Sequence, residues 1–124
     1  DPPAHQFYWL TVFHTNKGYG GYLQIHDTVE QTEALQLVTS EDGWQWQRQN
    51  DRRPILTPGG PGRFDSGMVF ATCGPMVIGD KAFILYGGQS WLHDQQLRYP
   101  DAEMTGPDAG IGIAEVDPAR LNLS

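Results

Sequence analysis

Three arginines in the middle of the sequence could recognise an anion. Arg52, Arg53 and Arg63 lie in a segment rich in proline and glycine. A guanidinium group binds a carboxylate or a phosphate through two parallel hydrogen bonds, so this set would fit an acidic sugar. The alternative is that they are solvated loop charges paired with the nearby Asp51 or Asp65.

A second set of candidate residues lies in a long polar segment, residues 90–107. It contains Trp91, His93 and Asp94. An indole ring offers a flat face on which a sugar can stack, and an imidazole beside a carboxylate can hydrogen-bond sugar hydroxyls. Segments of this length without regular structure are usually either functional or disordered. We expect Trp91, His93 and Asp94 to contact a ligand if the segment is functional.

Metal and cofactor chemistry have little support in the sequence. His14 and His26 lie near expected strand ends, and the histidines lack the spacing of metal ligands. Cys73 is the single cysteine, so an internal disulfide is excluded, and we expect a small buried side chain. No glycine-rich phosphate loop lies between a strand and a helix. We therefore expect no metal and no cofactor.

Composition restricts the classes of partner. The 124 residues carry a net charge of −7, which provides little positive field for nucleic acid. No apolar run approaches the roughly 18 residues of a membrane-spanning helix. We expect neither nucleic acid nor a membrane as partner, and one domain over residues 1–124.

The pattern of residues predicts an all-β protein. With 15 Gly and 9 Pro, turns are frequent and strands short. Aromatic, β-branched and alternating apolar residues mark the strands. The expected strands are residues 6–14, 21–26, 33–40, 44–48, 68–72, 75–78, 82–86 and 110–116, with Gly87-Gly88 ending the seventh.

The two halves of the chain share an order of elements. Each has an aromatic strand, a polar loop with histidine and a further apolar strand. We interpret residues 6–48 and 67–121 as two blade-like units joined by a linker at 49–66. Such units are typical of propellers, which repeat four-stranded blades around an axis.

Several motifs then point to a family. Ser40–Trp46 reads SEDGWQW, residues 61–67 read PGRFDSG, and residues 77–88 read VIGDKAFILYGG. From about Phe7 to Leu121 the chain resembles the five-bladed β-propeller glycoside hydrolases of the arabinanase, levansucrase and invertase type, families 43 and 32. The Ser-x-Asp-Gly segment also resembles a shortened Asp-box of sialidase propellers, in which Asp42 would hold a turn.

The resemblance implies roles for particular residues. These enzymes use paired carboxylates as acid and as base or nucleophile. Asp65 would be the base or nucleophile, Arg52 and Arg63 would orient substrate or tune the pKa of Asp65, and Trp91 with His93 would line the sugar site. The alternative for Asp65 is capping of a turn where a strand begins.

The resemblance does not identify the second catalytic carboxylate. The conceivable partners are Asp94, Asp101, Glu103 and Glu115, and none is assigned.

A five-bladed propeller is longer than this chain, which supplies about two incomplete blades. Unpaired strand edges invite pairing, so we expect either a longer protein or a homo-oligomer. The predicted function is glycoside hydrolysis, if a complete site is assembled. The alternative is a non-catalytic glycan- or protein-binding module that oligomerises through its open edges.

Overall fold

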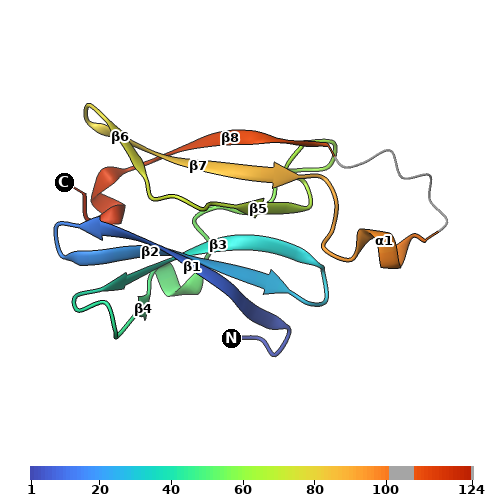
Figure 1. Cartoon of the computed structure of the whole chain (residues 1–124), viewed down its shortest axis with the longest axis horizontal. Coiled ribbons are helices and arrows are strands. Elements are labelled where there is room, and N and C mark those ends of the chain that lie inside the picture. Colours follow the sequence, from blue (N-terminus) through green and yellow to red (C-terminus); the bar gives the residue numbers. More distant parts are fainter. Residues whose placement is uncertain (101–107, 124) are drawn as a thin grey trace.

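The chain is built from β-strands, as the sequence predicted. The computed structural model describes residues 1–100 and 108–123 (Figure 1). One short helix, α1 (Gln95–Arg98), and two 3-10 turns, Asn50–Arg52 and Pro118–Leu121, accompany the strands. The strands are β1 (His5–Thr15), β2 (Gly18–Asp27), β3 (Thr32–Ser40), β4 (Gln47–Arg48), β5 (Met68–Phe70), β6 (Met76–Ile78), β7 (Lys81–Gln89) and β8 (Ala109–Val116).

Two antiparallel meanders make up the structure. In the first meander, β1 pairs with β2 and β2 with β3. In the second meander, β5 and β6 pair with the two ends of β7, and β8 pairs with β7 along its other side. The meanders are joined as one open sheet where β3 and β5 run parallel, through the single pair Glu33–Met68.

The hydrophobic core lies between the two meanders. Alternate residues of each strand point toward the other meander, because side chains in a strand alternate between its two faces. Figure 1 shows β5, β7 and β8 on one side and β1–β3 on the other. The core is formed by Tyr22, Leu35, Leu37, Val69, Ala71, Ala82, Ile84, Tyr86, Val116 and Leu121. Complete burial of a side chain such as Leu35 or Ile84 contributes about 1.5–3 kcal/mol.

The turn at Ser40–Trp46 is held by Asp42, as expected. One oxygen, Oδ1, accepts hydrogen bonds from the backbone N–H groups of Trp44 and Gln45, at 2.8 and 2.9 Å. Gly43 has φ +81°, a conformation that glycine adopts without steric cost. Because this turn occupies residues up to 46, the strand expected at 44–48 is reduced to β4.

Two other expectations were wrong. The predicted end of a strand at Gly87-Gly88 does not occur, and β7 continues through both glycines. They serve close packing instead: a Cβ on Gly87 would lie 2.8 Å from the Phe70 ring, and one on Gly88 would lie 2.6 Å from Cβ of Asp65. Cys73 was expected to be buried but is exposed, because it lies in the interruption between β5 and β6.

Candidate functional site

Three polar residues occupy core-facing positions at one end of the first meander. Gln24 and His26 follow Tyr22 on the same face of β2, and Glu33 precedes Leu35 on β3. All three are buried, and the exposed fraction of Glu33 is only 3%. Buried polar groups are costly unless they are hydrogen-bonded, so their partners are informative.

Gln24 connects the two meanders. Its Nε2 donates to Oε2 of Glu33 and to the backbone oxygen of Val69, both at 2.7 Å. The other Glu33 oxygen, Oε1, lies 3.7 Å from Nδ1 of His26, beyond hydrogen-bond distance. Among the described residues, neither Nδ1 of His26 nor Oε1 of Gln24 has a hydrogen-bond partner. Such buried atoms call for an explanation such as a water or ligand.

Three rings extend this cluster toward the surface. The Tyr8 ring stacks on His26 with centroids 4.6 Å apart, and His93 lies 4.5 Å from His26. The Tyr8 hydroxyl and Nε2 of His93 are 3.1 Å apart. Tyr8 follows Gln6, the partner of His26, by two residues, so strand alternation places it on the same face as His26.

The environment shifts the pKa values of Glu33 and His26 in opposite directions. Burial raises the pKa of Glu33, although the hydrogen bond from Gln24 and the nearby His93 oppose the shift. Burial and then His93 lower the pKa of His26, against the attraction of Asp27. His26 is therefore held neutral, and Glu33 binds its proton more tightly than a solvated glutamate does.

A hollow of about 280 Å³ adjoins the cluster. Its walls come from Met68 on β5, Gln89 at the end of β7, and residues 91–97. Trp91, His93 and Asp94 all line it, so the structure brings these three predicted residues together. Met68 and His93 belong both to this wall and to the surroundings of Glu33 and His26.

The loop that carries these residues is attached at several points. The backbone N–H of His93 donates to the Gln31 carbonyl at 2.8 Å, and Asp94 pairs with Arg98 at 3.2 Å. At Gly67, an added Cβ would lie 2.0 Å from the carbonyl oxygen of Trp91. Glycine there allows the loop to approach β5 closely.

Asp65 has a separate set of partners. Its exposed fraction is 3%, its Oδ2 accepts from the Tyr86 hydroxyl at 2.8 Å, and its Oδ1 accepts from Nε of Arg63 at 3.3 Å. Burial opposes ionisation, but these hydrogen bonds and the Arg63 charge outweigh it and lower the pKa of Asp65. Asp65 is not among the residues that line the hollow.

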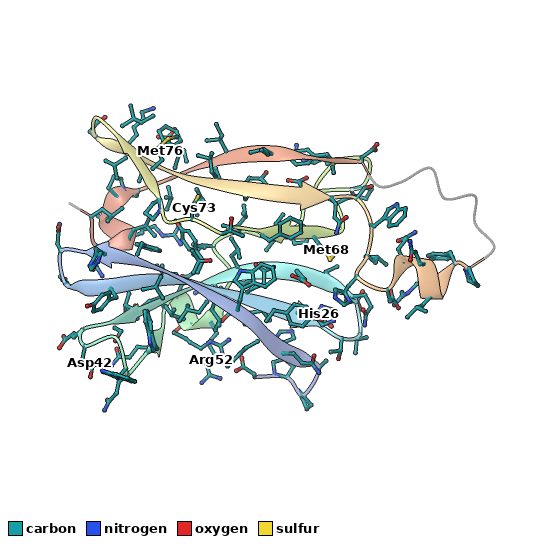
Figure 2. All side chains as sticks on the ribbon, viewed as in Figure 1. His26, Asp42, Arg52, Met68, Cys73 and Met76 are labelled. Carbon is teal, nitrogen blue, oxygen red and sulfur yellow. The ribbon has the colours of Figure 1, made fainter. Side chains whose placement is uncertain are left out.

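Other predicted residues lie elsewhere. Arg52 lies 4.0 Å from the Asp1 carboxylate, and Figure 2 shows it apart from His26 and Met68. Glu115 pairs with Lys81 at 3.4 Å on an exposed face. Asp101 and Glu103 are outside the described residues.

Sequence reasoning did not assign Tyr8, Gln24 or Glu33 to a site, and it placed His26 near a strand end without a role. The sequence does carry a signal for Gln24, His26 and Glu33. At these alternating, core-facing strand positions, polar side chains stand where apolar ones are expected. The contact of Tyr8 with His26 depends on the pairing of β1 with β2 at Gln6 and His26, which no local pattern specifies.

No group of three or more histidine, cysteine, aspartate or glutamate side chains is arranged to hold a metal in residues 1–100 and 108–123. Over the same residues, no helix has the length and apolar character required to cross a membrane.

Comparison with protein-family models found no matching family, and comparisons with curated proteins and with solved structures found no significant match.

Proposed function

We propose that the chain binds carbohydrate in the hollow beside β5 and the end of β7. The observation that carries this proposal is that Trp91, His93 and Asp94 line the same hollow, together with amide side chains of Gln89 and Gln95. Amides and carboxylates offer donors and acceptors that match sugar hydroxyls. An indole supplies the apolar face on which a sugar ring stacks.

The charge of the surroundings favours a neutral sugar. The chain has a net charge of −7, and Asp94 adds a carboxylate to the wall of the hollow. Arg52 and Arg63, which would attract an acidic sugar, have partners of their own outside the hollow. Asp94 is itself paired with Arg98. The preference for a neutral sugar therefore rests on the net negative charge of the chain and on the position of Arg52 and Arg63 outside the hollow.

Glycoside hydrolysis is the second candidate. Two carboxyl groups have pKa values shifted in opposite directions, which is how enzymes separate an acid from a base. The pKa of Glu33 is raised and that of Asp65 is lowered, and Glu33 lies opposite Met68, three residues after Asp65. Glu33 would be the general acid, and Asp65 would be the base or nucleophile, the role that the resemblance implies for it.

Binding is preferred over hydrolysis because of access. Glu33 and Asp65 are both buried, and neither lines the hollow. The carboxyl group that does line it, Asp94, is paired with Arg98. Hydrolysis by paired carboxylates requires both groups to flank the scissile bond.

The test is calorimetric titration with neutral arabino-, xylo- and fructo-oligosaccharides. We expect binding of at least one, and a loss of affinity of about tenfold or more in Trp91→Ala, in line with loss of an aromatic contact. Trp44→Ala is the matched control, because Trp44 is exposed and lies outside the hollow. Absence of binding, or equal effects of both substitutions, contradicts the proposal.

A parallel assay with aryl glycosides separates the two candidates. Turnover that is lost in Glu33→Gln, with binding and folding retained, would support the hydrolase. Sugar binding without turnover in the unmodified protein would support the binding module.

A further inference from the structure

Two histidines from distant parts of the chain pack against each other where the loop after β7 meets the first meander. The ring centroids of His26, on β2, and His93, in the loop, lie 4.5 Å apart. His26 is only 3% exposed, and no described residue hydrogen-bonds its Nδ1, whereas His93 lies at the surface. Tyr8 contacts both rings, at centroid distances of 4.6 and 5.4 Å. Two neutral imidazoles can pack in this way, but two imidazolium ions would repel each other.

His93 attaches the loop to the first meander. We call residues 91–98 the histidine loop. The backbone N–H of His93 donates to the Gln31 carbonyl, between β2 and β3, at 2.8 Å. A hydrogen bond from Arg98 to the Val29 carbonyl is longer, at 3.5 Å. A change in charge at the two histidine rings therefore acts where the loop is docked.

The carboxylates at the ends of this contact have other partners. Asp27 lies 3.5 Å from His5. Asp94 lies 3.2 Å from Arg98. Their attraction for a proton on the two rings is therefore shared with another cation or imidazole. The titratable groups that face the pair are Tyr8 and His5 on β1, Asp27 on β2, Glu33 on β3 and Asp94 in the loop.

Glu33 is the carboxyl group closest to the buried ring. Its Oε1 lies 3.7 Å from Nδ1 of His26, so ionised Glu33 attracts a proton onto that ring. Burial raises the pKa of Glu33, so it loses its charge more readily than a solvated glutamate does as the pH falls. Its attraction for a charged His26 therefore weakens as the rings take up protons.

We propose that this contact is a pH-sensitive switch, in which the histidine loop is docked on the first meander at neutral pH and is released when His26 and His93 take up protons at mildly acidic pH. The loop forms a wall of the hollow, so its release opens the hollow. The switch needs no ligand and does not rest on the proposed sugar binding.

The direction of the switch follows from the environment of His26. In the docked state burial, and then His93, lower the pKa of His26. Release exposes the ring, so the released state binds the proton more tightly than the docked state. Docking is therefore most stable above the ordinary histidine pKa of about 6.5 and weakens as the pH falls below it.

The first experiment is amide hydrogen exchange, measured by NMR on the unsubstituted chain at about pH 7.5 and about pH 5. One linked proton changes an equilibrium by up to about tenfold per pH unit. We expect the protection factor of the His93 amide, corrected for the intrinsic exchange rate, to fall by about fivefold or more. The Asn16 amide donates to the Asn122 carbonyl at 2.8 Å, beyond the other end of β1, and should keep its protection.

Two variants identify the ring that is responsible. His26→Gln keeps a polar side chain that cannot take up the proton, and should remove most of the pH dependence at His93. His14→Gln is the matched control, because it removes an exposed histidine near the other end of β1. It should leave the pH dependence unchanged.

An NMR titration of the unsubstituted chain keeps the test decisive if His26→Gln does not fold. Contacts between the ring protons of His26 and His93 should disappear as the His26 ring takes up its proton. Unchanged protection of the His93 amide, the same pH dependence in a folded His26→Gln, or a protonated His26 that keeps its contact with His93 overturns the proposal.

Discussion

Replacing Tyr86 by phenylalanine removes one hydrogen bond from a buried carboxylate and changes little else. The Tyr86 ring stacks with Phe64 at a centroid distance of 6.3 Å and lies tightly against Gly112, so phenylalanine should keep its position. The remaining partner of Asp65 is Arg63, whose side chain is largely exposed. A hydrogen bond to a charged buried group contributes about 1.5–3 kcal/mol, so we expect a loss of about 2 kcal/mol at pH 7.

Urea unfolding followed by tryptophan fluorescence measures this loss. With a slope of about 1–3 kcal/mol/M, the midpoint should fall by about 1 M. The pKa of Asp65 is lowered in the folded state, so the stability it contributes is present above about pH 4 and is lost as the pH falls through the folded value. The difference in the free energy of unfolding between Tyr86→Phe and the parent chain should therefore become smaller at acid pH.

A double-mutant cycle provides the control. In an Asp65→Asn background the hydrogen bond links neutral groups, and Tyr86→Phe should cost only about 1 kcal/mol. If Tyr86→Phe costs less than about 0.5 kcal/mol at pH 7, or costs the same in both backgrounds, the ionised Asp65–Tyr86 pair does not stabilise the fold as described.

Three further predictions concern other parts of the fold. Glu33→Gln should stabilise the protein at pH 7, because burial raises the pKa of Glu33 and so its ionised form disfavours folding as the pH rises above about 4.5. Urea unfolding at about pH 4.5 and at pH 7 tests this. The explanation is wrong if the gain in the free energy of unfolding is not larger at pH 7. Gly67→Ala should cost about 3 kcal/mol and weaken sugar binding, since its Cβ meets the Trp91 carbonyl, whereas Gly60→Ala, with open space around it, should be neutral in thermal unfolding. Asp42→Asn should lower the melting temperature at pH 7, because hydrogen bonds from backbone N–H groups stabilise the ionised carboxylate and lower the pKa of Asp42. If the melting temperature of Asp42→Asn stays equally far below that of the parent at acid pH, the ionised carboxylate is not the cause.

The strands were predictable because their signals are local. Alternation around Tyr22 and Leu35 indicates strands with one buried face, and Gly79, at φ +62°, marks the turn between β6 and β7. The predicted strand end at Gly87-Gly88 was wrong because glycine is used both in turns and where segments pack closely. Here the glycines allow close packing against Phe70 and Asp65, which lie far away in the sequence.

The site was predictable only in part, for the same reason. Trp91, His93 and Asp94 are neighbours in sequence, so their common location needed no knowledge of the fold. The partner of Asp65 is Tyr86, 21 residues away, and the contact of Gln24 with Val69 spans 45 residues. Such pairs follow from how the two meanders pack, which no local pattern in the sequence specifies.

The single Glu33–Met68 pair has a consequence for folding. The first meander is made of hairpins between neighbouring segments, which form quickly because their loops are short, whereas β7 and β8 of the second meander are joined across residues 90–108. Strand pairing between the meanders is confined to one position in the part of the chain that the structure describes, so their cohesion depends more on the side chains of the core than on a hydrogen-bonded ladder. We expect amide exchange to show two separately protected units once core residues such as Ile84 are truncated, with the N-terminal hairpin retaining its protection after docking is lost.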